Sequence, residues 1–577
     1  MPAIKPQAEK DKYDIYPAHG IGEGKIFRGI HSLATKISGE KIVIIDGFSG
    51  VFFNRIKTEL DSILASEYDI EAQWIDMNDL LKPEEDINRM ITPFLGGDDP
   101  FFGRRTTLSL SDFFDTKKLP VSLKNDSPSH YIIYGAGAAL YNGEGFLVYF
   151  DLPKNEFQFR LRAGSVNNLG VSAPSDSRSM YKRSYFVDWV VLNRHKQNII
   201  EKIDILVDCQ REDDLVWING EEFRNILHYM GRDLFRVRPW FEPGTWGGSW
   251  IKENIPGINK DVLNYAWSFE MITPENGLIL ESDGLMLEFS FDFLMYQEAK
   301  AVLGDCYERF GTEFPIRFDF LDTFDGGNLS IQCHPRPEYM KENFGENITQ
   351  EETYYILDTK DNAVVYLGFE ENIDKEEFRK SLETGFNENI PVRIEDFIRT
   401  HNARKHDLFL IPYGTIHGSG KNNLVLEISS TPYIFTFKMY DWLRPDLDGN
   451  PRPLNIERGM DNLFFERKGD KVNRELISKP VLLEEGNDWQ LFHLPTHVTH
   501  LYDVHRYHFR TSVKIKTRNK CHVLNLVEGE SIIVNPFHGR GRRFNYAETF
   551  VIPAAADSYT LLNESEKPAI LVLAFVK

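Results

Sequence analysis

Apolar residues in the first part of the chain form short runs that alternate with longer amphipathic stretches. The runs are rich in β-branched and aromatic residues, and they stand at 41–46, 72–77, 130–137, 145–153 and 202–209. Residues 55–64 and 185–202 instead have the spacing of amphipathic helices. Strands that alternate with helices favour a parallel sheet. We therefore expect residues 1–235 to form an α/β domain with a mostly parallel sheet.

The pattern changes after residue 235. Residues 236–257 are rich in Pro, Gly and Trp, which favours turns over long helices. Short apolar strands then recur to the end of the chain, interrupted by helical stretches such as 374–386 and 391–401. Many short strands at modest spacing are typical of a sandwich or jelly roll. We expect two mainly β domains, at 236–480 and 481–577, joined by the segment 481–495.

Composition narrows the functional classes. The 577 residues are 42% hydrophobic, enough for packed cores, and they carry a net charge of −21. A general nucleic-acid binder needs a basic face, so we expect no nucleic-acid partner, although a local group of Arg and Lys could still bind a small anion. The four cysteines are far apart, the N-terminus lacks the apolar core of a signal peptide, and no run is apolar enough to span a membrane. We therefore expect a cytoplasmic protein with no membrane partner.

The turn after the first apolar run lies where a phosphate-binding loop would be. Counting from Gly47, the rule G-x-x-x-x-G-K-[ST] requires Gly, Lys and a hydroxyl residue at the next diagnostic positions. Those positions hold Phe52, Phe53 and Asn54, so the phosphate-contacting Lys and the magnesium-holding hydroxyl are both missing. Residues 38–230 resemble a P-loop kinase of the uridine-kinase type whose loop has degenerated. The resemblance implies a scaffold or interaction domain, and we expect no nucleotide binding.

Four side chains in the β-rich part have the residue types of a divalent metal site. Gln332 and His334 are two apart on a predicted strand, so both leave it on the same face. Glu352 lies on another predicted strand, and His417 follows a Gly-Thr turn. Two imidazoles and a carboxylate are a common catalytic zinc set. Taken alone, each histidine could instead be a hydrogen-bonded core residue.

Longer motifs surround these four residues. They are FEPGTWGGSW at 241–250, FLDTFDGGNLSIQCHP at 320–335, a Pro-x-Gly-Thr-x-His run at 412–417 and KMYDWLRPDLDGNPRPLNIERG at 438–459. With these motifs, residues 236–577 resemble the class I, zinc-dependent mannose-6-phosphate isomerases of the compact bacterial type. The resemblance implies a cupin fold and conversion of mannose 6-phosphate to fructose 6-phosphate through a cis-enediolate. It also implies one zinc ion per chain, held by Gln332, His334, Glu352 and His417.

Three positions depart from the pattern of that family. Gln350 and Asp319 stand where the family commonly has Lys, and Lys438 stands where it has a catalytic Arg. Lys438 keeps the charge but loses the bidentate fork, which Arg444 or Arg452 could supply. Lys438 and Arg444 are therefore the candidate catalytic residues. Two hypotheses follow: an aldose–ketose isomerase of sugar phosphates, or a non-catalytic sugar-phosphate sensor that keeps the metal site.

A histidine-rich segment at 493–509 offers a second candidate site. Strand alternation would place His493, His497 and His505 on one face, although Pro495 interrupts any single register. The segment fits either a second metal site or polar strand positions packed between the two β domains, and the packed arrangement is favoured.

Overall fold

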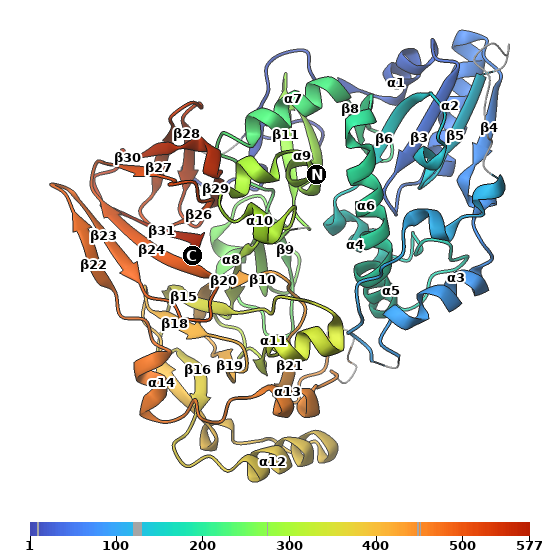
Figure 1. Cartoon of the computed structure of the whole chain (residues 1–577). Coiled ribbons are helices and arrows are strands. Elements are labelled where there is room, and N and C mark those ends of the chain that lie inside the picture. The colour runs from blue at the N-terminus through green and yellow to red at the C-terminus, as the bar shows by residue number, and fades with distance from the viewer. Residues whose placement is uncertain (8–10, 98, 119–129, 274, 447–448, 450–451) are drawn as a thin grey trace. The chain divides into compact units, whose positions relative to one another are not determined.

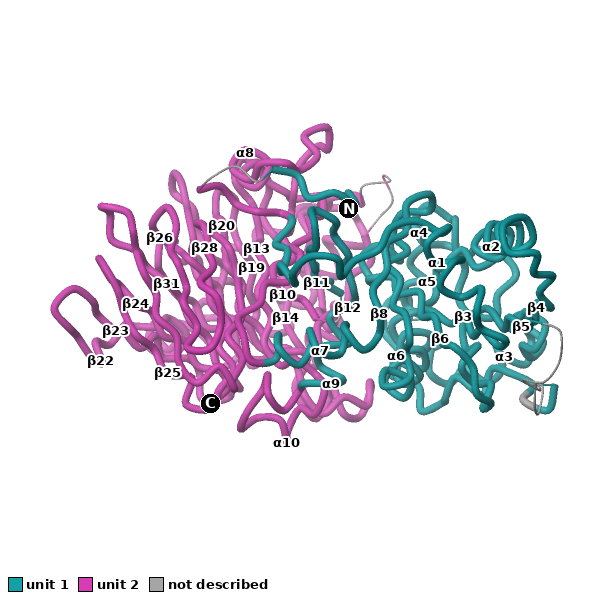
Figure 2. The backbone as a smooth tube through the Cα atoms, turned by 90° about the horizontal axis from the view of Figure 1, so that it is seen from above, with its two compact units in different colours: residues 1–7, 16–231, 274–298 teal, residues 8–15, 232–273, 299–577 magenta. Residues whose placement is uncertain are grey.

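The structure is a computed structural model that describes residues 1–7, 11–97, 99–118, 130–273, 275–446, 449 and 452–577. The chain divides into two compact units, which Figure 2 colours separately. Unit 1 comprises residues 1–7, 16–231 and 274–298, and unit 2 comprises residues 8–15, 232–273 and 299–577. None of the described helices is long and apolar enough to cross a membrane.

Unit 1 is built on a seven-stranded sheet (Figure 1). The strand order is β2-β8-β7-β6-β3-β5-β4, and the five strands from β7 to β4 run parallel, as the alternation of strands and helices predicts. β8 and β2 are added antiparallel at one edge. The strands are β2 (Phe27–Arg28), β3 (Ile42–Gly47), β4 (Ala72–Asp76), β5 (His130–Tyr134), β6 (Phe146–Asp151), β7 (Ile205–Asp208) and β8 (Val216–Asn219).

Helices connect the parallel strands of unit 1. α2 (Phe53–Tyr68) buries one apolar face and ends at Asp69, which has a left-handed backbone conformation. The helix predicted at 185–202 is interrupted, because a π-helical turn at Ser184–Asp188, buried throughout, precedes α6 (Trp189–Ile199). A π-helical turn contains about one residue more than an α-helical turn, so it shifts the face that the following helix presents. The other helices are α1 (Ile30–Ile37), α3 (Glu84–Ile91), α4 (Lys154–Arg162), α5 (Ser177–Arg183) and α7 (Gly220–Met230).

Residues 274–298 also belong to unit 1, although the predicted boundary at 235 leaves them outside it. Buried polar contacts hold the segment: Ser290 N donates to Asp151 Oδ2 at 2.6 Å, and Asp292 forms an ion pair with Lys154. These partners are more than 130 positions apart, so no local pattern reveals them. The elements involved are β1 (Ala18–Gly20), β11 (Gly277–Ser282) and β12 (Leu285–Ser290), which form a three-stranded sheet, and α9 (Asp292–Leu303).

Two sheets form the first part of unit 2, with strand orders β18-β15-β20-β13-β10-β9 and β17-β16-β19-β14-β21. Tyr354 and Val425 from the first sheet and Val365 and Leu367 from the second belong to one hydrophobic core, so the sheets form a sandwich. The strands are β9 (Trp240–Glu242), β10 (Trp267–Met271), β13 (Ile316–Asp322), β14 (Ile331–Cys333), β15 (Glu352–Thr359), β16 (Val364–Phe369), β17 (Ile398–Asn402), β18 (Leu408–Ile411), β19 (His417–Ser419), β20 (Asn423–Ser430) and β21 (Phe437–Tyr440).

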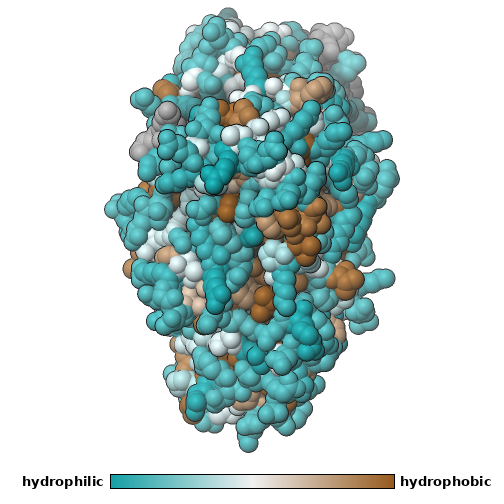
Figure 3. Space-filling view, turned by 90° about the vertical axis from the view of Figure 1, so that its left-hand side faces the viewer, coloured by the Kyte–Doolittle hydropathy of each residue, from teal (hydrophilic) through white to brown (hydrophobic). Residues whose placement is uncertain are grey.

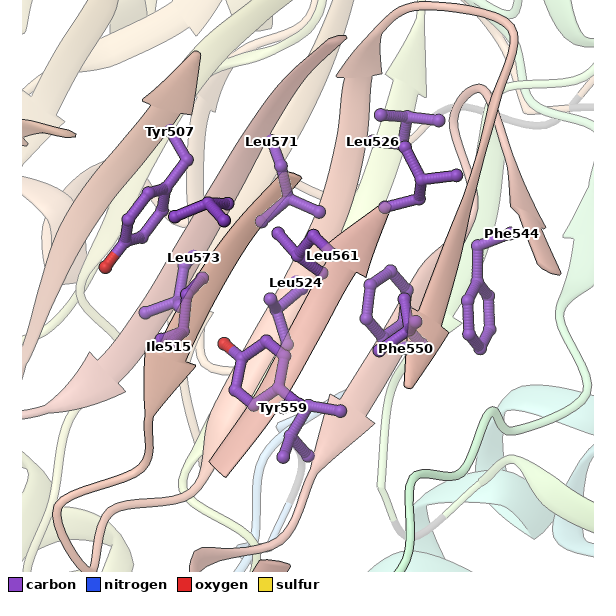
Figure 4. Packing of buried hydrophobic residues seen from close by; sticks show 14 of the residues in the cluster. Tyr507, Ile515, Leu524, Leu526, Phe544, Phe550, Tyr559, Leu561, Leu571 and Leu573 are labelled. Atoms are coloured by element: carbon purple, nitrogen blue, oxygen red, sulfur yellow. The ribbon is translucent and has the colours of Figure 1, made fainter. Parts of the chain in front are cut away.

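Residues 481–577 form two further sheets, ordered β22-β23-β24-β31-β26-β29 and β25-β30-β27-β28. Figure 4 shows that Tyr507 and Leu571 from the first sheet and Tyr559 and Leu561 from the second lie in one core. The strands are β22 (Val481–Glu485), β23 (Trp489–Leu494), β24 (Tyr502–Phe509), β25 (Ser512–Lys516), β26 (His522–Glu528), β27 (Ser531–Pro536), β28 (Arg542–Asn545), β29 (Thr549–Ile552), β30 (Ser558–Asn563) and β31 (Ala569–Val576). The division of unit 2 into separate domains at 480 stays a prediction.

Apart from α12, the described helices that lie wholly within unit 2 are short. The stretch predicted at 374–386 is α12 (Lys375–Glu388), which begins where Asp374 accepts a hydrogen bond from the Glu377 amide. The helix predicted at 391–401 is wrong, because the segment forms a single 3-10 turn followed by β17. Its β-branched residues favour a strand. The remaining helices are α8 (Trp250–Asn254), α10 (Tyr307–Phe310), α11 (Pro337–Tyr339), α13 (Ile456–Asn462) and α14 (Asp470–Glu475).

Candidate metal centre

Strand pairing brings the four predicted ligands together. β14 carries Gln332 and lies between β19 and β21, and Gln332 is directly opposite His417, the first residue of β19. His334 follows β14 immediately, and Glu352 is the first residue of β15 in the facing sheet. The site therefore lies between the two sheets of the sandwich, with each side chain fixed by a strand or a strand end.

The donor atoms of these residues converge. Glu352 Oε2 lies 3.0 Å from His334 Nε2, Glu352 Oε1 lies 2.8 Å from His417 Nε2, and Gln332 Nε2 lies 3.4 Å from His417 Nε2. One donor atom each from His334, Glu352 and His417 fall within 4.8 Å of one another, and all three residues are buried. It is the one group of three or more His, Cys, Asp or Glu side chains with this geometry among the residues that the structure describes.

The surroundings orient the two imidazoles toward one point. His334 Nδ1 lies 3.2 Å from the Phe435 carbonyl oxygen, and His417 Nδ1 lies 2.9 Å from the Thr415 carbonyl oxygen. A carbonyl can only accept, so each Nδ1 donates to a carbonyl and each Nε2 is the ring nitrogen that faces Glu352. His334 Nε2 lies close to Glu352 Oε2, and Glu352 Oε1 lies close to His417 Nε2, yet His334 Nε2 and Glu352 Oε1 find no hydrogen-bond partner of suitable geometry among the described residues. Buried polar atoms that converge without a hydrogen bond fit a bound cation.

The charge state of Glu352 also suits a cation. Burial by itself raises the pKa of this carboxyl, but the imidazoles of His334 and His417 outweigh burial and hold the pKa well below its usual range. Gln350 Nε2 donates to Glu352 Oε2 at 3.1 Å and supports the ionised form further. His334, Glu352 and His417 thus offer two imidazole nitrogens and a carboxylate, a donor set that suits zinc and related divalent ions. The Gln332 amide turns its nitrogen toward His417, and it would add an oxygen ligand if the amide group were turned over.

A cavity of about 150 Å³ opens beside this group. Gln332 and Glu352 line it, together with Asp319, Glu427 and Lys438. Asp319 on β13 and Glu427 on β20 are directly opposite each other in the sheet. Burial raises the pKa of Asp319 to about 7 against the lowering influence of Arg317, and burial with the carboxylates of Asp319 and Glu352 holds the pKa of Glu427 well above its usual value.

Sequence reasoning missed Glu427 as a functional candidate. The sequence does contain an indication, because Glu427 is the one charged residue in the apolar run of β20. A charged residue is rarely buried in a strand unless it is paired or has a function. Asp319 was noticed only as a departure from a family pattern. The pairing of the two could not be read from the sequence, since it depends on β13 and β20 being neighbours.

The two predicted catalytic cations differ in position. Lys438 on β21 pairs in register with Gln332 and lines the cavity. Arg444 does not line it: its Nη2 donates to Asp441 Oδ1 at 2.7 Å. Arg452 also pairs with Asp441 and donates to Thr245 Oγ1 at 2.9 Å. Both arginines therefore pair with the same carboxylate, that of Asp441, and Lys438 is the predicted cation that reaches the cavity.

The Trp-Gly-Gly motif explains how the cavity wall is built. Trp246 lines the cavity, and its carbonyl oxygen accepts a hydrogen bond from Gly327 N at 3.0 Å, just upstream of β14. A Cβ atom on Gly248 would lie 2.2 Å from Asp322 Oδ1 and 2.5 Å from Phe324 N. The glycine therefore lets two backbone segments pass in contact.

The histidine-rich segment makes no second cluster of this kind in the described part of the chain. His493 Nε2 lies 2.9 Å from Asp503 Oδ2, and its ring is 5.7 Å from that of His505. These two residues are opposite each other on β23 and β24. They are polar strand positions, as the favoured alternative predicts.

Comparison with known proteins gives two separate likenesses. Residues 29–232 match a family described as a domain of unknown function (DUF8485). A probable mannose-6-phosphate isomerase of Bacillus subtilis, GmuF, is 27% identical over 251 residues, which are 44% of this chain and 73% of that protein. The mannose-6-phosphate isomerase ManA of the same organism is 25% identical over 224 residues, 39% of this chain and 66% of that protein. The match thus spans about two thirds of the length of these relatives.

Solved structures include the mannose 6-phosphate isomerase of Bacillus subtilis. It aligns with 59% of this chain and 99% of its own, with a TM-score of 0.49 and 19% sequence identity. A mutant phosphomannose isomerase of Salmonella typhimurium aligns with 60% of this chain, with a TM-score of 0.47 and 13% identity. Over part of its length, then, the chain is similar to mannose-6-phosphate isomerases, as its motifs predict.

Proposed function

We propose that this protein is a metal-dependent aldose–ketose isomerase of sugar phosphates, with mannose 6-phosphate and fructose 6-phosphate as the leading pair and the cytoplasm as its compartment. The observation that carries the proposal is the buried convergence of His334, Glu352 and His417 beside a cavity lined by further acidic and basic groups. The similarity to curated isomerases supports the reaction class.

Each part of the reaction has a matching group in the cavity. A divalent ion, zinc in this proposal, would be held by Gln332, His334, Glu352 and His417 and would supply Lewis-acid polarisation of the sugar carbonyl. Lys438 would bind the oxygen on which negative charge develops as the cis-enediolate forms, or the anionic end of the substrate.

Asp319 and Glu427 are the proposed proton carriers. Moving a carbonyl between C1 and C2 requires one group to take a proton from one carbon and return it to the other. A carboxyl whose pKa lies near 7, as that of Asp319 does, exchanges protons readily at neutral pH. The opposite carboxyl, Glu427, holds its proton more tightly and would give it to the C1 oxygen as this becomes a hydroxyl, and recover one from the C2 hydroxyl that becomes the carbonyl.

The test measures fructose 6-phosphate formed from mannose 6-phosphate with and without a chelator, and again after Zn²⁺ is restored. Turnover that a chelator abolishes and Zn²⁺ recovers supports the isomerase. Lys438→Met should lose most activity, whereas Arg444→Met should retain it, because Arg444 does not line the cavity. Equal loss in both variants would contradict the role given to Lys438.

A non-catalytic sugar-phosphate sensor is the second candidate. Gln350 favours it, because an amide that donates to Glu352 occupies the position of a family lysine and removes one cation from the site. Saturable binding of hexose phosphates with no turnover, in protein loaded with Zn²⁺, would favour the sensor over the enzyme.

For unit 1 we propose a scaffold or interaction role without nucleotide binding, on a degenerate P-loop-like framework. Arg160 Nη1 donates to the Gly50 carbonyl oxygen at 2.8 Å, so an arginine binds the loop through its carbonyl. Asp46 accepts hydrogen bonds from the amides of Gly47, Gly137 and Ala139, which are then not free for phosphate. Calorimetry with Mg-ATP tests this, and micromolar affinity would overturn it.

A further inference from the structure

One edge of the C-terminal sheet is left open. β22 is the outermost strand of the sheet β22-β23-β24-β31-β26-β29, and all five of its residues are exposed. Val481, Leu482 and Leu483 are consecutive and are 49%, 45% and 53% exposed. Figure 3 faces the side on which β22 lies in Figure 1, and apolar side chains gather there within a hydrophilic surface.

The opposite edge of the same sheet is covered. β29 is buried along its whole length, and Val551 exchanges backbone hydrogen bonds of 3.0 and 2.8 Å with Phe235. Edge strands in monomeric proteins are usually short, charged or covered, because free backbone groups pair with other strands. β22 instead presents three apolar residues in a row. The strand has protective features beside them, since it is short, follows Pro480, ends in Glu484 and Glu485, and has a bulge at Leu483.

The charges at the two ends of β22 are opposite in sign, so they would be complementary between two paired copies of the strand. Lys479 precedes the apolar residues and Glu485 follows them, and neither has an ion-pair partner among the described residues. If two copies of β22 pair antiparallel about a two-fold axis at Leu482, Val481 lies opposite Leu483 of the second copy and Lys479 lies opposite Glu485. A parallel pair would instead place Glu484 and Glu485 of both copies together, which like charges disfavour.

We propose that β22 is a dimerisation edge, on which a second copy of this chain adds its own β22 antiparallel about Leu482. The contact is isologous, so it closes at two copies and does not extend into a fibre. It covers the apolar residues on both sides at once, joins two six-stranded sheets, and gives Lys479 and Glu485 opposite charges to face.

Analytical ultracentrifugation of the full chain tests the proposal. The wild type should sediment at twice the chain mass of 66.9 kDa at high concentration and dissociate on dilution. Leu482→Lys should raise the dimer dissociation constant about 100-fold, because it sets two like charges face to face at the axis. Leu263→Lys changes another exposed leucine, 83% exposed, and should leave the constant unchanged. A wild type that is monomeric at every concentration overturns the proposal, as does equal weakening by both variants.

Charge reversal tests the register. Lys479→Glu alone should weaken the dimer about tenfold, because Glu485 of the second copy then faces a like charge. The double variant Lys479→Glu with Glu485→Lys restores opposite charges and should return the dissociation constant to that of the wild type. A double variant no tighter than the single one would overturn the antiparallel register. Both residues are exposed, so the folded chain should be unaffected, which circular dichroism checks.

Discussion

Replacing His417 with Ala tests whether the converging side chains bind a metal. The change removes one of four donor atoms and one of the two imidazoles that keep Glu352 ionised. A four-ligand zinc site contributes about 10–16 kcal/mol of binding free energy. One ligand in four therefore accounts for about 3 kcal/mol, which corresponds to a rise of about 100-fold in the dissociation constant.

The assay is competition for Zn²⁺ with a chromophoric chelator at fixed pH. His401→Ala is the matched control, because His401 lies on β17 of the same sheet, is buried, and binds the Leu367 carbonyl and not the cluster. We expect His417→Ala to bind Zn²⁺ about 100-fold more weakly and His401→Ala to bind it as the wild type does. Comparable affinities for wild type and His417→Ala, or equal losses in both variants, would refute the metal site.

The remaining predictions concern stability and are measured by thermal or urea unfolding. In metal-free protein, burial disfavours ionisation of Asp319 and raises its pKa from near 4 in the unfolded chain to about 7. Ionised Asp319 therefore lowers the stability of the fold as pH rises through this range. Asp319→Asn should stabilise the fold at pH 8 by at most about 4 kcal/mol and bring no gain at pH 4. Gly248→Ala should cost about 1–3 kcal/mol, because its Cβ would lie 2.2 Å from Asp322 Oδ1, whereas Gly39→Ala, with open space around it, should not. Lys196→Met leaves the buried Asp151 without its ion-pair partner at 3.0 Å and should cost about 3–5 kcal/mol.

Local patterns were sufficient where one segment determines the outcome. The alternation of apolar runs with amphipathic stretches predicts the parallel sheet of unit 1, since each strand and helix has its own periodicity. The spacing of Gln332 and His334 predicts a shared face because a strand repeats every two residues. His417 and Glu352 could be added because motifs in known isomerases accompany them.

Features that depend on which side chains or strands come into contact were not predictable. The pairing of Asp319 with Glu427 requires β13 and β20 to be neighbours, which neither strand encodes alone. Arg444 has the charge expected of a catalytic residue, but a carboxylate three positions away, Asp441, binds it first. The predicted helix at 391–401 failed because its polar and apolar spacing fits a helix while β-branched residues and tertiary pairing select β17.

Residues 274–298 return to unit 1 after the chain has entered unit 2, and this limits where the polypeptide can be cut. The chain enters each unit more than once, so a single cleavage or gene fission near residue 232 would not release two autonomous halves. The downstream fragment would carry β11 and β12 without β1, and Asp292 without Lys154. A cut at this point would therefore leave unit 1 without one of its sheets complete.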